Sequence, residues 1–228
     1  MTSMPATQLR LCADCGFREI KLDNGKLETR WMGLFKPFAE TGYLETGLDG
    51  LVGRYSEPHR HYHNLNHVRQ SLDAFDRIVD DLTDPFTIEA AIWFHDVVYE
   101  PKSSKNEARS AEYASDFLSP TKLSANVISE IDHLIRLTRQ PADPSTEDEK
   151  YLIDIDLSTL GAGRELYDRY EAMIRKEYAY VPEQLYRKGR KALLSTFLDG
   201  EHIYRTRYFR ERFEAQARAN IGRALKKL

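Results

Sequence analysis

The segment formed by residues 85–99 constrains the fold more than any other part of the chain. It reads PFTIEAAIWFHDVVY and is apolar nearly all round. A helix with this pattern has no face suited to water, so it is expected at the centre of a fold, covered by other elements. Asp84 and Pro85 suit the N-cap and first turn of this helix, and Pro101 is expected to end it.

Helical periodicity extends over most of the remaining chain, and the alternation typical of strands is nearly absent. With 228 residues, 41% of them hydrophobic, the chain can bury one sizeable core. We therefore expect an all-α single domain of about nine or ten helices. The expected helices are about 27–42, 48–55, 64–82, 85–99, 103–118, 124–138, 150–161, 165–180, 182–198 and 204–228.

Residues 1–25 are predicted to form a mobile tail that contains both cysteines, Cys12 and Cys15. A CxxC pair can form half of a zinc site or a redox couple, but no second pair is present, so two free thiols are the favoured interpretation. The sequence has no secretory signal core and no apolar run long enough for a membrane span. A net charge of −3 disfavours broad nucleic-acid binding. We expect a cytoplasmic protein with no membrane partner.

Histidines are concentrated before and within the helix predicted over 64–82. Four of the seven lie between residues 59 and 67, and His63 and His67, four residues apart, share one face of a helix. His59 and His61 precede this helix in a predicted loop, where contact with a phosphate and simple surface exposure are equally expected.

Two predicted buried helices also carry carboxylates. His95-Asp96 interrupts the most apolar segment, and Asp156 lies in the apolar run LIDIDLSTL. A buried carboxylate costs several kcal/mol unless it is paired or bound to a cation, so the pattern predicts a shared metal ion. Imidazole and carboxylate suit Mn, Co, Ni, Fe, Zn or Mg, and the lack of thiolates argues against a closed structural zinc site. Asp154, two residues before Asp156, is expected to point away.

The ordered set His67, His95-Asp96 and Asp156 resembles the H…HD…D signature of the HD superfamily of metal-dependent phosphohydrolases. YHNLNH also looks like the YHNxxH motif of cyclic-nucleotide phosphodiesterases, which are relatives in that superfamily. A closer likeness is to small bacterial predicted HD phosphohydrolases, and it covers roughly residues 27–222. The segments that carry it are YHNLNHV, WFHDVVY, NEARSA, DIDLSTLG, IRKEY, Gly189-Arg190 and IYRTRYF.

This resemblance implies an HD-type helical domain over residues 26–228. It implies a divalent metal ion held by His67, His95, Asp96 and Asp156, and His63 as general acid. The implied activity is hydrolysis of a phosphate ester or anhydride in a nucleotide or other small phosphorylated metabolite. A divalent ion suits this chemistry because it neutralises phosphoryl charge and activates water.

Five further residues are candidates for the site. Glu107 would orient the attacking water or join the metal shell, or it is only a first-turn acid stabilised by the helix dipole. Substrate-binding candidates are Asn106, Arg175, Tyr178 and Arg190. The two arginines are candidates because guanidinium groups match phosphate oxygens. A solvated face or an Arg–Glu pair is the competing interpretation for the arginines.

One departure from the related pattern concerns the segment after LIRLT, where a further histidine is expected and the sequence reads TRQP. His133, earlier on the same predicted helix, is a substitute ligand or, more commonly, a core-edge residue. A complete dinuclear site is therefore in question.

Three other functions compete with hydrolysis. A regulatory module would bind metal and nucleotide without catalysis. A dinuclear oxygenase would need more histidine ligands. Nucleic-acid binding through residues 204–228 is disfavoured because the charges there alternate in sign. A homo-oligomer is left open.

Overall fold

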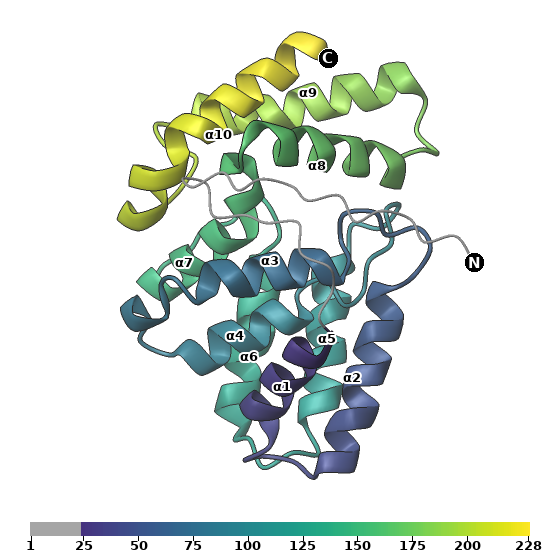
Figure 1. Ribbon diagram of the computed structural model, residues 1–228, viewed down its shortest axis with the longest axis vertical. Coiled ribbons are helices and arrows are strands. Elements are labelled where there is room, and N and C mark those ends of the chain that lie inside the picture. The colour runs from purple at the N-terminus through teal and green to yellow at the C-terminus, as the bar shows by residue number, and fades with distance from the viewer. Residues whose placement is uncertain (1–23) are drawn as a thin grey trace, which may run out of the picture.

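The computed structural model describes residues 24–228, which form ten α-helices and two short 3₁₀ helices and contain no strand (Figure 1). The chain is therefore all-α, as its periodicity predicts. The helices are α1 Asn24–Phe35, α2 Thr41–Tyr55, α3 Leu65–Phe75, η1 Val79–Asp81, α4 Pro85–Phe94, α5 Asn106–Leu118, α6 Ala125–Leu137, α7 Glu147–Asp156, η2 Leu157–Gly161, α8 Arg164–Glu177, α9 Glu183–Asp199 and α10 Arg207–Lys227. The predicted tail with Cys12 and Cys15 lies almost wholly outside the described residues.

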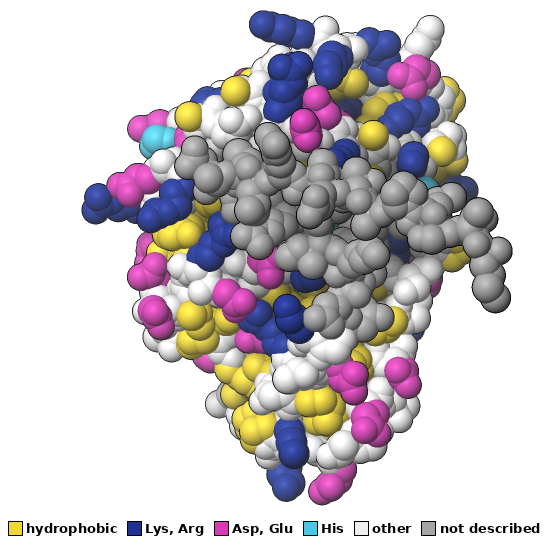
Figure 2. Space-filling model, in the orientation of Figure 1, with side chains coloured by type: hydrophobic (Ala, Val, Ile, Leu, Met, Phe, Trp, Pro, Cys, Tyr) yellow, Lys and Arg dark blue, Asp and Glu magenta, His cyan; other side chains and the backbone are white. Residues whose placement is uncertain are grey.

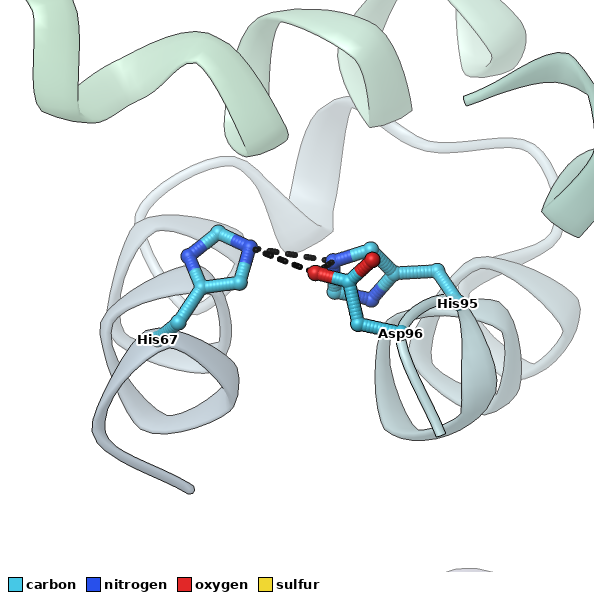
Figure 3. A group of neighbouring side chains, drawn as sticks. All are labelled: His67, His95 and Asp96. Carbon is cyan, nitrogen blue, oxygen red and sulfur yellow. Dashed lines mark hydrogen bonds and ion pairs between the residues drawn. The ribbon is translucent and has the colours of Figure 1, made fainter. Parts of the chain in front are cut away.

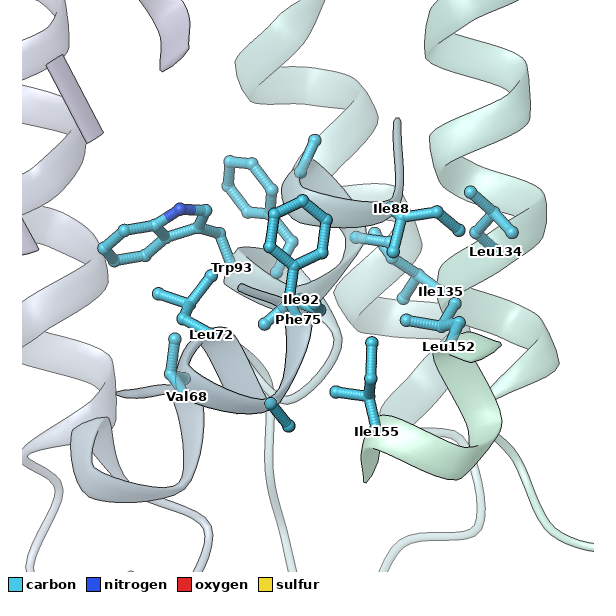
Figure 4. Packing of buried hydrophobic residues seen from close by; sticks show 14 of the residues in the cluster. Val68, Leu72, Phe75, Ile88, Ile92, Trp93, Leu134, Ile135, Leu152 and Ile155 are labelled. Atoms are coloured by element: carbon cyan, nitrogen blue, oxygen red, sulfur yellow. The ribbon is translucent and has the colours of Figure 1, made fainter. Parts of the chain in front are cut away.

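The helices form two parts of one compact domain. Helices α1 to α7 make up the lower part in Figure 1, and α8, α9 and α10 form a layer across its upper end. The apolar α4 lies at the centre, as expected, with all its residues from Thr87 to Phe94 buried except Glu89. Apolar side chains from α3, α6 and α7 surround it (Figure 4). This packing fixes the ends of α3, α4 and α7 relative to one another.

Two helix starts illustrate side-chain capping, and the cap of α4 is the predicted one. The Asp84 side chain accepts a hydrogen bond from the backbone N–H of Thr87, with Pro85 in the first turn of α4. Ser124 caps α6 by accepting from the N–H of Val127. Helix α5 begins at Asn106, three residues later than the predicted start, and has no side-chain cap.

Some helix boundaries also differ from the sequence-based ranges. Helix α4 ends at Phe94, so His95 and Asp96 lie just beyond its last residue rather than inside a helix reaching Tyr99. Residues 97–99 are apolar because they are buried in a turn. Helix α2 begins at Thr41 and passes through Gly47, where a Cβ atom would overlap the ring of Phe117. That glycine permits close helix packing and does not end a helix.

Two further boundary differences involve 3₁₀ turns. Helix α3 ends at Phe75, with the separate turn η1 following it, instead of continuing to Leu82. Helix α7 ends at Asp156 and continues as η2 to Gly161. A 3₁₀ turn is common at the end of a helix because it satisfies backbone carbonyls that lack an i+4 partner.

The surface carries charges of both signs, and basic side chains are most numerous at the upper end of the face seen in Figure 2. None of the helices within residues 24–228 combines the length and apolarity required to cross a bilayer.

Candidate metal centre

Four predicted ligands come together from three helices. His67 lies in the first turn of α3, His95 and Asp96 directly follow α4, and Asp156 is the last residue of α7. His67, His95 and Asp96 point toward one another (Figure 3), and one ligand atom from each lies within 4.8 Å of the others. Asp156 contacts both histidines from α7.

The distances in this cluster match those between ligands of a single ion. The Nε2 atoms of His67 and His95 are 3.0 Å apart. Asp156 Oδ1 lies 3.1 Å from His67 Nε2 and 3.6 Å from His95 Nε2. Asp96 Oδ2 lies 3.2 Å from His95 Nε2 and 3.6 Å from His67 Nε2. Ligands bonded at about 2.1 Å to one ion are about 3.0–3.4 Å apart at octahedral or tetrahedral angles. The two histidines are therefore spaced to share a divalent cation with Asp96, and Asp156 lies at a similar distance from both of them.

Hydrogen bonding determines which nitrogen of His95 faces the cluster. Its Nδ1–H donates to the carbonyl oxygen of Ile92 at 2.9 Å. The lone pair of the neutral ring is therefore on Nε2 and points toward His67 Nε2, which is the arrangement common for metal-ligating histidines. If one proton were shared between the two nitrogens, its single positive charge would neutralise only one of the two carboxylates. A divalent cation neutralises both.

The cluster has a strongly negative electrostatic character. Burial lowers the pKa of His95, but the neighbouring Asp96 and Asp156 carboxylates outweigh it and raise that pKa well above the ordinary value. Burial would raise the pKa of Asp96 and of Asp156, yet the surrounding histidines hold both well below the usual range. The carboxylates thus remain ionised and attract cations, and a metal must compete with a proton on His95.

A cavity of about 370 Å³ adjoins the cluster and is lined in part by His95, Asp96 and Asp156. This volume is within the range of small-ligand sites. Five other predicted site residues line the same cavity, and these are His63, Asn106, Glu107, Tyr178 and Arg190.

Arg175 lies outside this lining. Its guanidinium donates to the carbonyl oxygens of Tyr178 and Val181 and pairs with Glu183, so it stabilises the connection between α8 and α9. This placement agrees with the competing Arg–Glu interpretation.

His63 is held in one orientation by a buried glutamate. Its Nδ1–H donates to Glu177 Oε2 at 2.6 Å, and its ring stacks on Tyr99 with centroids 4.1 Å apart. Nε2 of His63 makes no hydrogen bond to any described residue, and the residue lines the cavity. Burial lowers the pKa of His63, but Asp96 and Glu177 raise it more, so the net pKa lies above the ordinary value. An imidazole that lines the cavity and has a raised pKa suits a general acid.

Glu177 was missed by sequence reasoning, although it stands between the candidates Arg175 and Tyr178. Its Oε1 accepts from the backbone N–H groups of His61, Tyr62 and His63, and its Oε2 also accepts from the Tyr99 hydroxyl. An acid in the motif IRKEY was the available signal, but its partners are distant in sequence: Tyr99 lies 78 residues away and residues 61–63 lie more than 100 away.

Arg60 is a second residue that the sequence did not single out. Its buried guanidinium donates to the carbonyl oxygens of His63, Asp96 and Val97. It therefore ties the histidine-rich loop to the turn that carries the His95-Asp96 pair.

The remaining candidates have varied surroundings. The Asn106 side chain bonds the backbone N–H and C=O of Glu100. Arg190 is buried and forms a two-pronged pair with Glu171, besides donating to the Tyr170 hydroxyl. In the part of the chain that the structure describes, the Glu107 carboxylate has no hydrogen-bond partner.

Three further side chains are placed away from the four-residue cluster. His133 pairs with Glu149, which is the N3 residue of the capping box at the start of α7, and does not line the cavity. Asp154 is buried and accepts from the backbone N–H groups of Arg205 and Thr206, so it points away from Asp156's partners, as expected. The Nε2 of His59 bonds the carbonyl oxygen of Tyr99.

No protein-family model, curated protein or solved structure matches the chain.

Proposed function

We propose that the protein is a metal-dependent phosphohydrolase that cleaves a phosphate ester or anhydride in a small phosphorylated metabolite, nucleotides included. The observation that carries the proposal is a pair of imidazole Nε2 atoms 3.0 Å apart, each 3.1–3.6 Å from a carboxylate oxygen of Asp96 and of Asp156, beside a cavity that His63 also lines. Hydrolysis needs charge neutralisation at phosphorus and a proton for the leaving oxygen, and these groups are suited to both tasks.

Each residue has a defined role in this proposal. His67, His95, Asp96 and Asp156 would hold the divalent ion, which would neutralise phosphoryl charge and lower the pKa of water. As the bond from phosphorus to the leaving group breaks, the leaving oxygen takes the proton from His63 Nε2.

Two residues support this chemistry at its edges. Glu177 accepts from Nδ1 of His63, so it acts as a positioning residue and stabilises the imidazolium before transfer. Arg190 uses Nε and Nη2 for Glu171 and Tyr170, which leaves Nη1 for a phosphate oxygen.

The proposal includes membership of the HD superfamily. The order His67, His95-Asp96, Asp156 supports it, and so do an all-α fold and the convergence of these residues from three separate helices. The metal identity is a matter for experiment, because imidazole and carboxylate accept Mn, Co, Ni, Fe, Zn and Mg.

The test is phosphate release from a panel of phosphorylated metabolites by protein loaded separately with each metal. Asp156→Ala should abolish metal-dependent release while the helical circular dichroism persists. Asp49→Ala, which changes an exposed aspartate on α2, serves as the matched control and should behave as wild type. A wild-type protein that binds metal yet is inert on the whole panel would favour the regulatory module instead.

A further inference from the structure

The cavity beside the metal cluster has two unlike walls. The wall at the start of α5 and the end of α6 is polar, and its residues are Ser103, Asn106, Glu107, Thr138 and Gln140. The wall from η2, α8 and α9 contributes apolar side chains, which include Leu160, Ile174, Leu193 and Phe197. In Figure 1 the α8–α9 layer lies across the end of the part that contains α5 and α6. A ligand between them needs a polar edge and an apolar face.

Gln140 presents a hydrogen-bond donor that no group in the described part of the chain uses. Its Oε1 accepts from the backbone N–H of Ala142 at 3.3 Å, which fixes the orientation of the amide. Its Nε2 is buried and has no hydrogen-bond partner among residues 24–228. A shielded donor without an acceptor is unfavourable, so a donor of this kind calls for an explanation. An acceptor on a ligand in the cavity would satisfy it.

Glu107 provides the complementary acceptor at the same end of the helical pair. Helices α5 and α6 run antiparallel, because they pack against each other and only the short connection 119–124 joins the end of α5 to the start of α6. The start of α5 and the residues after α6 therefore meet, and both Glu107 and Gln140 line the cavity. The wall thus offers an amide donor near a carboxylate without a partner among residues 24–228.

We infer that Glu107 and Gln140 form the subsite for the leaving group, and that the leaving group is a hydroxylated ring, as in a sugar or polyol phosphate. A hydroxyl both donates and accepts, so neighbouring hydroxyls can donate to the Glu107 carboxylate and accept from Gln140 Nε2. The C–H face of the ring packs against Leu193 and Phe197. This inference rests on the proposed phosphohydrolase function and names its substrate class.

The test compares two phosphate monoesters with the same ring, inositol monophosphate and cyclohexyl phosphate, on metal-loaded protein. Wild type should show the higher kcat/KM with inositol monophosphate. Gln140→Ala and Glu107→Gln should each reduce that preference by about tenfold, the effect of one hydrogen bond to a buried or charged group. The exposed residues Gln184 and Glu165 provide matched controls, Gln184→Ala and Glu165→Gln, which should keep the wild-type preference.

Three outcomes would overturn the assignment. If Glu107→Gln reduces kcat/KM equally on both esters, Glu107 acts on the attacking water rather than on the leaving group. A wild type without preference for inositol monophosphate would exclude the hydroxyl subsite. A strong preference for guanosine monophosphate, reduced by both variants, would show that the subsite recognises the edge of a nucleobase rather than hydroxyl groups.

Failure of the phosphohydrolase function would be recognised separately. If neither ester is hydrolysed, calorimetry with inositol monophosphate decides the subsite alone. Wild type should then bind this ester about tenfold more tightly than Gln140→Ala, and equal affinities would refute the subsite.

Discussion

Replacing Glu177 by glutamine should weaken both the fold and the positioning of His63. The Glu177 carboxylate is fully buried and accepts five hydrogen bonds. Burial alone would raise its pKa, but the hydrogen bonds from His63 and from backbone N–H groups, with the charge on His63, lower it from 4.5 to about 2. At about 1.4 kcal/mol per pKa unit, ionised Glu177 contributes about 3 kcal/mol to the free energy of unfolding.

The sign of the pH dependence follows from the lowered pKa of this acid. The Glu177 contribution is complete above its unfolded pKa of 4.5 and is lost as the pH falls toward the folded value of about 2. Glu177→Gln should therefore be about 3 kcal/mol less stable near neutral pH and should lack this part of the acid slope.

Urea unfolding followed by helical circular dichroism between about pH 7 and pH 2 measures both effects. Glu165→Gln, at an exposed position in the first turn of α8, should match wild type. Because Glu177 also raises the pKa of His63, an NMR titration should show a lower His63 pKa in Glu177→Gln. Identical acid slopes in Glu177→Gln and wild type, or an unchanged His63 pKa, would refute the reasoning.

Three other predictions follow from the site. His63→Ala should keep its metal but lose about a hundred- to ten-thousandfold in turnover on an alkyl phosphate, and much less on a nitrophenyl phosphate. The exposed control His202→Ala should keep wild-type turnover on both esters. Equal losses of His63→Ala on the two esters would exclude a general-acid role. Because carboxylates raise the pKa of His95, metal affinity measured by calorimetry should increase as the pH rises through that pKa, and a pH-independent affinity would contradict this. Thr146→Ala removes the capping box of α7 and should lower the free energy of unfolding by about 1 kcal/mol in urea, with an unchanged value counting against it.

The sequence predicted the features that depend on local pattern. Segment 85–99 was recognisable as central because it has no polar face, and Asp84 caps α4 by a rule that involves residues of a single helical turn. The convergence of His67, His95, Asp96 and Asp156 was predictable because unusual polar residues interrupt apolar runs. The end of α4 was not, because burial of Val97, Val98 and Tyr99 in a turn gives the same apolar pattern as a helix.

Features that depend on distant contacts could not be read from the chain. Glu177 bonds His63 across 114 positions, and Arg60 bonds Asp96 across 36. Neither separation leaves a periodic signal. The same limit applies to Gly47, whose closeness to Phe117 is a matter of helix packing.

The most direct test of the central claim is a crystal structure of metal-loaded protein with anomalous diffraction at the metal's absorption edge. We predict one strong anomalous peak about 2.0–2.3 Å from the Nε2 atoms of His67 and His95 and from carboxylate oxygens of Asp96 and Asp156. A peak elsewhere on the chain, or no peak at this cluster after loading with each candidate metal, would contradict the account.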